Sequence, residues 1–487
     1  MDSDIKEVEI VILGAGLGGL GMAAQLKRQN SDDFIIIDKC PDIGGVWLNN
    51  TYPGAACDTE SHLYCYSYHL HLRVSALYAG RDELLGYINS LADRFDLRRH
   101  LQLNTEILSA KWSNNKKRWL LTLSNGEVMT SRFFIASWGQ LNTPYIPTIP
   151  GFEQFAGKSF HSARWRHDIN LKDKRVASIG SAASAVQYVP EIAPKVAHLT
   201  VYQRSANWIV PRNQEIFTSA QLDEFSKDPV AFEKNRQQIH LMREVGALRV
   251  RHGTVEQAEG IAVARQHLAD QVSDKALREK LVPDYELGCK RILRSDDYYP
   301  ALMRDNVLLQ TEKISHFDKQ GIVTADGKLE KFDVVIFGTG FQSQSFQGDM
   351  QIIGTAGSLQ QKWAEGAEAY LGITVPDFPN MFLIYGPNTN LNHSSIISMM
   401  EIQQNYILNA ISHLRQHVEQ AIAPKNQLFI AYNDDVQKAM QASAFSSNCS
   451  SWYKNAAGKV INNWPGSVEE YKQVAQWRAD DFIWDRT

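Results

Sequence analysis

Three glycines near the N-terminus have the spacing of a turn that binds the phosphates of a dinucleotide. They follow a predicted buried strand at residues 9–13 (EIVIL) and precede a helix-like stretch at residues 20–29. The first glycine would permit a tight turn, the second would let a pyrophosphate approach the backbone, and the third would let helix and strand pack closely. These glycines are Gly14, Gly16 and Gly19. A second apolar run ends at Asp38, where a carboxylate would bind ribose hydroxyls.

A second unit of the same kind occurs later and ends in the opposite charge. A strand-like segment at residues 175–179 (RVASI) leads into Gly180, followed by a helix pattern and a second strand-like segment at residues 198–202. Arg204 lies 24 residues after Gly180 (204 − 180), the same offset that separates Asp38 from Gly14 (38 − 14). A guanidinium at this position suits a 2′-phosphate through a charge-assisted contact. The alternative is a surface cation at the end of a strand.

The second turn also departs from the glycine pattern. Alanine occupies its second and third glycine positions, at Ala182 and Ala185. A methyl group at Ala182 would crowd the pyrophosphate slightly and weaken or shift its docking. Together the two units predict one adenosine nucleotide without a 2′-phosphate and one NADP.

A segment rich in glycine and aromatic residues follows the first unit, where a flavin ring would lie once its pyrophosphate is anchored. Residues 44–47 (GGVW) place two glycines beside Trp47, which could form a wall of the ring site. Asp58 follows within CDTES, near several tyrosines. Its carboxylate could act on a cofactor, and the alternative is that it caps a local turn.

These motifs require elements that bring two nucleotides together. The strand–turn–helix–strand pattern at both units predicts an α/β fold with two Rossmann-like dinucleotide-binding domains. Alternating residues around Trp112 and at 119–123 predict an antiparallel meander, and prolines at 144–150 mark a crossing between domains. We expect a first domain at 1–143, a second at 144–334 with a helical insertion at about 216–283, and a return to the first domain at 335–487.

Composition excludes several classes of protein. The chain of 487 residues has a net charge of −4, which gives no overall attraction to nucleic acid. It has five cysteines and no CxxC pair, so we expect no dithiol centre, zinc ribbon, metal site or disulfide scaffold. The N-terminus lacks an apolar signal core, and no run approaches ~20 apolar residues. We therefore expect a cytoplasmic protein without a membrane span, and leave its oligomeric state open.

Residues 155–165, FAGKSFHSARW, have the form FxGxxxHxxxW. This segment resembles the fingerprint of the type I Baeyer–Villiger monooxygenases. The related flavin-containing monooxygenases usually have Phe or Tyr where this fingerprint has Trp. Its positions are Phe155, Gly157, His161 and Trp165. Arg166 stands where the family normally has Pro or Asp. By itself His161 would be a hydrogen-bonded linker histidine, and we interpret it as part of an interdomain hinge.

The resemblance extends through nearly the whole chain in the family's order. Its motifs are GxGxxG, GGVW, TYPGAACDTES, SWGQLNTP, the fingerprint, VYQRSANWIVPR, GCKRI, FGTGF and YGPNTNLNHSS. The forms YQRSANW and GPNTNL are most similar to the 4-hydroxyacetophenone monooxygenase branch.

The resemblance implies a role for each matching position. Arg291 would stabilise a negatively charged peroxyflavin, and Asp58 would support it. Lys290 and Arg204 would hold the NADP phosphate beside Ser205. Without the match, Lys290 and Arg291 would be interpreted as a solvated basic pair. Further implied cofactor positions are Asp38, Gly45, Val46, Trp47, Tyr64, Ile107, Gly180, Ser181, Ser184, Gln187 and Ile396.

The resemblance also implies an activity. FAD reduced by NADPH would react with O₂ to give a C4a-peroxyflavin, which would insert oxygen next to a ketone carbonyl and yield an ester or lactone. The alternatives are oxygenation of amine nitrogen or sulfide sulfur, uncoupled NADPH oxidation, and a catalytically silent flavin-binding protein. A disulfide reductase is disfavoured because no two cysteines are closely spaced. The sequence does not specify the substrate.

Overall fold

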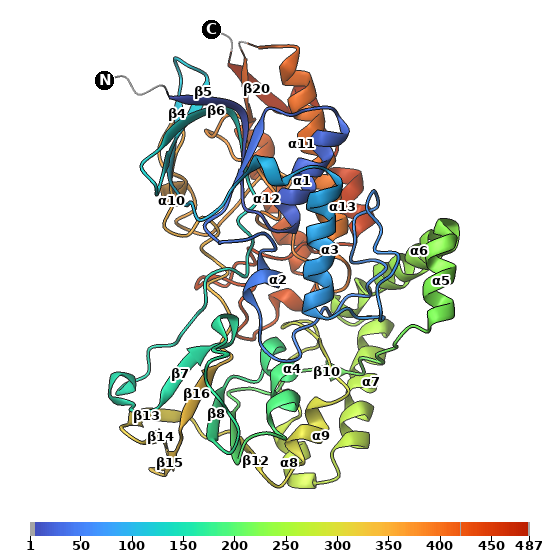
Figure 1. The fold of residues 1–487 in the computed structure, drawn as a ribbon, viewed down its shortest axis with the longest axis vertical. Coiled ribbons are helices and arrows are strands. Elements are labelled where there is room, and N and C mark those ends of the chain that lie inside the picture. The colour runs from blue at the N-terminus through green and yellow to red at the C-terminus, as the bar shows by residue number, and fades with distance from the viewer. Residues whose placement is uncertain (1–4, 419, 486–487) are drawn as a thin grey trace.

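The computed structural model describes residues 5–418 and 420–485. Two parallel sheets lie in separate halves of the molecule, the first in the upper half and the second in the lower half of Figure 1. This arrangement confirms the predicted α/β fold with two Rossmann-like units.

The first sheet combines a parallel core with the antiparallel meander expected around Trp112. Its strand order is β17-β4-β5-β6-β1-β2-β3, and β18 pairs with the end of β6. The strands β1, β2, β3, β6 and β18 run parallel, whereas β4, β5 and β6 are antiparallel. The bounds are β1 (Lys6–Leu13), β2 (Phe34–Ile37), β3 (Leu101–Gln102), β4 (Ile107–Ser113), β5 (Arg118–Leu123), β6 (Val128–Ala136), β17 (Gln351–Ile353) and β18 (Met381–Leu383).

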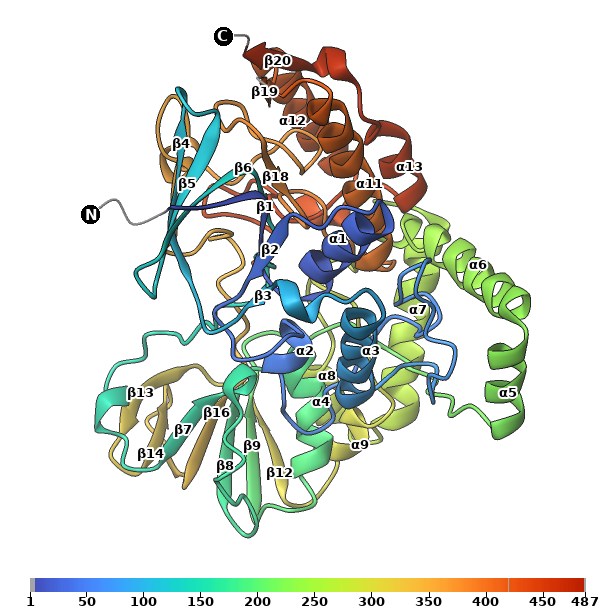
Figure 2. The ribbon, with the colours of Figure 1, turned by 45° about the horizontal axis from the view of Figure 1, so that its top comes forward.

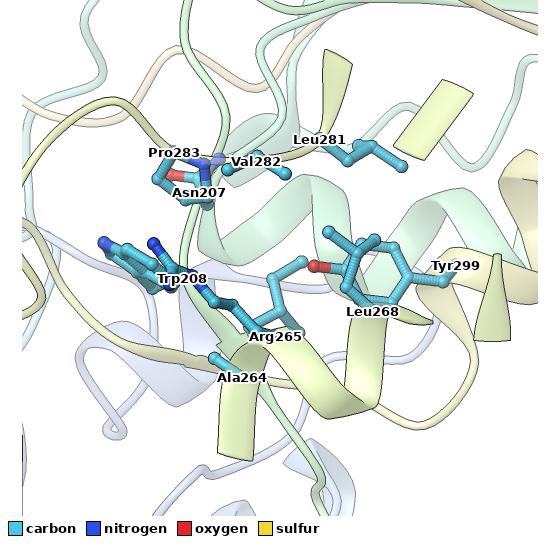
Figure 3. Close-up of a pocket in the computed structure, with 10 residues that line it drawn as sticks. Asn207, Trp208, Ala264, Arg265, Leu268, Leu281, Val282, Pro283 and Tyr299 are labelled. Carbon is cyan, nitrogen blue, oxygen red and sulfur yellow. The ribbon is translucent and has the colours of Figure 1, made fainter. Parts of the chain in front are cut away.

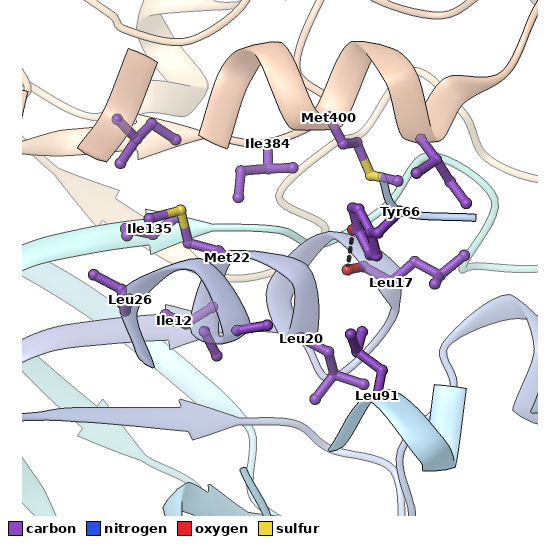
Figure 4. Close-up of a cluster of buried hydrophobic side chains, with 14 of the residues drawn as sticks. Ile12, Leu17, Leu20, Met22, Leu26, Tyr66, Leu91, Ile135, Ile384 and Met400 are labelled. Atoms are coloured by element: carbon purple, nitrogen blue, oxygen red, sulfur yellow. Dashed lines mark hydrogen bonds between the residues drawn. The ribbon is translucent and has the colours of Figure 1, made fainter. Parts of the chain in front are cut away.

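Helices cover the parallel core because its central strands are apolar on both faces. The predicted first helix begins at Leu17 and runs to Arg28 as α1. Figure 4 shows its side chains between the sheet and the C-terminal helix α11, which contributes Met400 to the same cluster. The Tyr66 hydroxyl donates to the Leu17 carbonyl at 2.6 Å and fixes the first turn of α1. Two more helices flank it, α2 (Val46–Asn49) and α3 (Arg81–Arg94).

The second sheet has the order β12-β9-β8-β16-β7 and is parallel throughout. Its strands are β7 (Lys158–His161), β8 (Arg175–Ile179), β9 (His198–Tyr202), β12 (Val307–Gln310) and β16 (Val334–Phe337). Helices α4 (Ala183–Ile192) and α9 (Tyr298–Leu302) join it, and β13 (Ile314–Asp318), β14 (Gly321–Thr324) and β15 (Leu329–Lys331) form an antiparallel sheet. Because β16 pairs with β7 and β8 as far as Phe337, the second sheet extends three residues past the expected boundary at 334 (337 − 334).

The expected insertion at about 216–283 is helical. It contains α5 (Ser219–Lys227), α6 (Pro229–Val245), α7 (Val255–Gln271) and α8 (Lys275–Lys280). Thr218 starts α5 with a capping box, and Asp228 caps α6 in front of the proline at its first position. Helices α5 and α6 project sideways from the body of the molecule (Figures 1 and 2). The short strands β10 (Ile209–Val210) and β11 (Leu293–Arg294) pair at the base of the insertion.

The C-terminal region returns to the first domain, since β17 and β18 join its sheet and α11 packs on α1. It comprises α10 (Leu359–Lys362), α11 (Ile396–Arg415), β19 (Ala421–Pro424), α12 (Asn426–Met440), α13 (Val468–Val474) and β20 (Phe482–Asp485). Short 3₁₀ helices occur at Arg98–His100, Phe152–Gln154, Ser162–Arg164, Leu248–Val250, Ala444–Ser446 and Ala479–Asp481. None of the helices in the described part of the chain has the length and hydropathy needed to span a bilayer.

The two chain crossings between the domains lie side by side. The Tyr145 amide donates to the Gly340 carbonyl at 2.9 Å, and the Gln342 amide donates to the Thr143 carbonyl at 2.8 Å. Two backbone strands therefore join the halves at this position, which is where the prolines predicted a crossing.

One disulfide corrects the expectation drawn from the cysteines. Cys289 and Cys449 are bonded although 160 residues separate them in the sequence. Their Cα atoms lie 6.4 Å apart because the segment before Arg291 packs against a C-terminal loop. Sequence spacing carries no signal for such a long-range contact. Cys40, Cys57 and Cys65 are free thiols.

Candidate active site

The first glycine turn has no room for side chains. Gly14 has a φ of +103°, and a Cβ there would lie 2.3 Å from the Ser137 carbonyl oxygen. A Cβ on Gly19 would lie 1.9 Å from the Gly14 carbonyl oxygen, so strand and helix are in backbone contact. The N-terminus of α1 has no side-chain cap, which leaves backbone N–H groups available for an anion.

Asp38 lies beside this turn as the sequence predicted. Its carboxylate accepts hydrogen bonds from the amides of Ala15 at 2.7 Å and Cys40 at 2.8 Å. A Cβ on Gly16 would lie 3.5 Å from the Gly45 Cα, so two glycine backbones face each other across a narrow gap. The carboxylate and this gap together suit the ribose and pyrophosphate of a dinucleotide.

The second turn has a different packing. Gly180 has a φ of +109° and a Cβ there would lie 2.3 Å from the Gly338 carbonyl oxygen, as at the first turn. Ala185, at the third glycine position, is fully buried and fits. In this unit the position without room for a side chain is Gly338 at the end of β16, rather than the third glycine position of the helix. A Cβ on Gly338 would lie 2.7 Å from the Tyr188 hydroxyl. Ala182 caps α4 without a side-chain hydrogen bond and is exposed.

Cationic side chains gather next to the second turn. Lys290 donates from Nζ to the Ser205 hydroxyl at 2.7 Å and lies over the Tyr285 ring. Burial, and then the charge of the exposed Arg204, lower the pKa of Lys290. Within the described residues neither Lys290 nor Arg204 forms an ion pair. The structure therefore brings the predicted 2′-phosphate residues together as a positive site that a phosphate would neutralise.

Asp58 and Arg291 meet although 233 residues separate them. Arg291 donates from Nε to Oδ2 at 2.9 Å, and from Nη2 to both carboxylate oxygens at 2.7 Å. Burial by itself would raise the pKa of Asp58, but Arg291 outweighs it and lowers that pKa. Asp58 in turn raises the pKa of Arg291, so both groups stay charged. The side chains keep 30% and 33% of their surface accessible, so the fixed cation can face a reacting group.

Aromatic side chains surround this ion pair. Trp47 donates from its indole N–H to the Tyr64 hydroxyl at 3.2 Å. Tyr385 lies near enough to Arg291 to influence its pKa, as does Tyr453. Tyr385 has a φ of +60°, a conformation that bulky side chains rarely adopt and that often occurs at functional sites.

The remaining predicted cofactor residues occupy different settings. Ser181 is buried and accepts a hydrogen bond from the Asn207 side chain, and Ser184 lies near Tyr52. Gln187 bonds to Tyr52 and Ala56 of the first domain, so its side chain joins the two domains. Three further positions are at the starts of elements: Val46 of α2, Ile107 of β4 and Ile396 of α11.

The fingerprint residues lie in the second domain near the crossing. Trp165 packs on Phe160 and Tyr188, and a Cβ on Gly157 would meet the ring of Phe155 and the Asp333 carbonyl. His161 accepts the Ala163 amide at Nδ1, and burial lowers its pKa to about 4. Its ring lies near Phe341, next to the second crossing strand. The histidine is thus neutral and close to the crossing.

The insertion packs back on the second domain beside the cationic site. Figure 3 shows Asn207 and Trp208 facing Arg265 and Leu268 of α7 across a small pocket, with Tyr299 of α9 at one end. The indole N–H of Trp208 donates to the Tyr285 carbonyl at 2.9 Å. These contacts fix the segment that carries Lys290.

Comparison with known proteins identifies the family. The flavin-binding monooxygenase-like family matches residues 7–227. A Baeyer–Villiger monooxygenase of Streptomyces coelicolor (strain ATCC BAA-471 / A3(2) / M145) is 36% identical over 476 residues, which is 96% of this chain and 91% of the relative. The chain belongs to the type I Baeyer–Villiger monooxygenases. This family assignment confirms the resemblance noted in the fingerprint.

Solved structures agree with this assignment. The closed crystal structure of cyclohexanone monooxygenase superposes on this monooxygenase with a TM-score of 0.88 at 25% identity and covers 99% of this chain and 100% of the other. OTEMO in complex with FAD and NADP gives a TM-score of 0.89 at 25% identity and covers 98% and 99% of the two chains.

In this monooxygenase several residues near the Asp58–Arg291 pair were not among those predicted from the sequence. Tyr385 precedes the GPNTNL motif and could have been found there, whereas Tyr453 lies in a segment without a motif. Glu60, within the CDTES motif, forms a buried ion pair with Arg243 of the insertion. No local pattern marks Arg243, because its partner lies 183 residues away.

Proposed function

We propose that the Asp58–Arg291 pair serves the oxygenation of a ketone. The monooxygenase would convert a ketone, O₂, NADPH and a proton into an ester or lactone, NADP⁺ and water. A single observation carries this assignment: a partly accessible guanidinium is held in place by two-point hydrogen bonding to a carboxylate. Such a fixed charge stabilises developing negative charge without reorganising during the reaction.

The two glycine turns fit the two cofactors. Both have positive φ at the first glycine and an uncapped helix N-terminus, so each offers free N–H groups to a pyrophosphate. Asp38, the glycine gap at residues 16 and 45, and Trp47 support FAD binding at the first turn. Arg204, Ser205 and Lys290 would bind the 2′-phosphate of NADPH at the second. When bound, FAD supplies the redox chemistry that takes a hydride from NADPH and activates O₂.

The protein's own residues supply charge and orientation. Asp58 keeps Arg291 protonated and fixes the direction of its guanidinium. Arg291 would then balance negative charge on oxygen as the ketone carbonyl is attacked. The paired strands at residues 143–145 and 340–342 would act as the hinge for movement of the second domain.

Some finer assignments extend this proposal. YQRSANW and GPNTNL support placement in the 4-hydroxyacetophenone monooxygenase branch, so aryl ketones are the first substrates to test. We propose domains at 1–143 with 338–487, and at 144–337. We also propose a cytoplasmic location.

Replacement of Arg291 tests this function most directly. The variant Arg291→Ala should bind FAD and accept hydride from NADPH but lose ketone oxygenation by about a hundredfold or more. The assay measures ester formed from a panel of ketones by mass, with sulfides included to detect heteroatom oxygenation. Arg98→Ala, at an exposed ion pair, is the matched control and should behave like the parent. Ester formation at the parent rate by Arg291→Ala would reject this role for Arg291.

A further inference from the structure

A buried ion pair joins the helical insertion to the loop that carries Asp58. Arg243, in the last turn of α6, is 8% exposed and Glu60 is 4% exposed. Arg243 contacts the Glu60 Oε2 atom from Nε at 2.7 Å and from Nη2 at 2.6 Å. Because the desolvation of two charges offsets much of their attraction, a buried ion pair is weak evidence of a role in stability alone. Its other contacts indicate what it does.

The same guanidinium also bonds two backbone carbonyls. Arg243 Nη2 donates to the main-chain carbonyl of Asp58 at 3.2 Å, and Nη1 donates to the carbonyl of His393 at 3.5 Å. The second carboxylate oxygen of Glu60 accepts the Tyr78 hydroxyl at 3.0 Å. Arg243 therefore holds the main chain of Asp58, whereas Arg291 binds its carboxylate.

Helix α6 is docked on this loop at further points. Asn235 hydrogen-bonds through Nδ2 to His62 Nδ1 at 2.6 Å, and the Phe232 ring lies 4.3 Å from the His62 ring. The loop at residues 58–62 thus takes its position from α6 rather than from the first sheet alone. A shift of Arg243 would pass directly to the Asp58 backbone.

We propose that Arg243 and Glu60 are positioning residues for oxygenation, because they fix the Asp58 backbone so that its carboxylate can orient Arg291. This inference rests on the function proposed above. Among the described residues, no hydrogen bond or ion pair joins Arg243 or Glu60 to Arg204, Ser205 or Lys290, so we expect flavin reduction by NADPH to continue without them. Without them Asp58 would orient Arg291 less well, and NADPH and O₂ would be consumed without oxygenation of the ketone. The uncoupled reaction converts NADPH, a proton and O₂ into NADP⁺ and H₂O₂.

The experiment replaces the pair with apolar side chains of similar size, as Glu60→Leu with Arg243→Met, so that neither member is left as the unpaired half of this ion pair. FAD content, the anaerobic rate of flavin reduction by NADPH, and the ester and H₂O₂ formed per NADPH are measured on the holoenzyme. We expect normal FAD content and reduction, with ester per NADPH lower by about tenfold or more and H₂O₂ in its place. Arg243→Lys keeps a charge, but its ammonium lacks the guanidinium fork, so we expect the same change to a smaller degree.

A second ion pair provides the matched control. Glu9 and Arg415 join β1 to α11 with bonds of 2.9 and 2.5 Å, away from Asp58. Glu9→Leu with Arg415→Met should not increase H₂O₂. Equal uncoupling in the control pair, or parent-like ester per NADPH in the Glu60–Arg243 variants, would overturn the inference. If the double variant does not fold, Arg243→Lys decides the result. Failure of the proposed function is distinguished by Arg291→Ala, which would then retain ester formation.

Discussion

The two dinucleotide units share a backbone plan and differ in what completes it. In each, a glycine with positive φ lies against a carbonyl at the end of the neighbouring strand, Ser137 in the first and Gly338 in the second. The first unit packs helix on strand through Gly19 and ends in a carboxylate. The second unit has room for Ala185 in the helix and ends in Arg204, a cation beside Lys290. A common scaffold thus leaves nucleotide choice to a few side chains beyond the turn.

The difference between Gly19 and Ala185 gives the largest expected effect. In Gly19→Ala the new Cβ would lie 1.9 Å from a backbone oxygen, so α1 must move away from β1 and the pyrophosphate site opens. We expect purified Gly19→Ala to contain little FAD, measured by flavin absorbance per protein.

The reciprocal change Ala185→Gly is the matched control. It removes one methyl group and should cost about 1–2 kcal/mol of stability while NADPH binding is kept. Full flavin content in Gly19→Ala would contradict the close packing assigned to the first turn.

The contrast between Asp38 and Arg204 predicts the choice of nicotinamide. Arg204→Ala should lower kcat/KM for NADPH by about tenfold to a hundredfold and leave NADH almost unaffected, because only NADPH has the 2′-phosphate. Steady-state assays with both cofactors measure the change. Arg175→Ala removes the same charge from the start of β8, at the opposite end of the sheet, and should change neither value. An unchanged preference for NADPH in Arg204→Ala would argue against the phosphate site.

A smaller effect concerns pH. Burial and Arg204 lower the pKa of Lys290, so in the free enzyme this lysine loses its charge at a lower pH than an ordinary lysine. Since a neutral amine no longer attracts phosphate, kcat/KM for NADPH should fall as pH rises through that lowered pKa. Lys290→Arg should remove the decline. NADH serves as the control cofactor, and an equal decline with NADH would assign the titration to another group.

Much of the fold followed from local patterns. Residues 10–13 are apolar on both faces of a parallel strand, and the glycines after them are required by sterics, so strand, turn and helix could all be placed. The helix begins at Leu17 rather than at residue 20, because the glycine-rich residues 17–19 belong to α1. Glycine weakens the intrinsic preference for helix, and packing of the buried face overrode it here.

The sequence by itself determined two nucleotide units, their opposite terminal charges and, through family resemblance, Arg291 and Asp58. These features are local, since turns, apolar runs and motifs depend on neighbouring residues. Only the tertiary structure decided that α6 holds the Asp58 backbone through Arg243, that Gln187 bridges the domains, and that Cys289 meets Cys449. Each of these contacts joins residues more than 100 positions apart, and packing of whole domains brings such residues together without leaving a periodic signal in the chain.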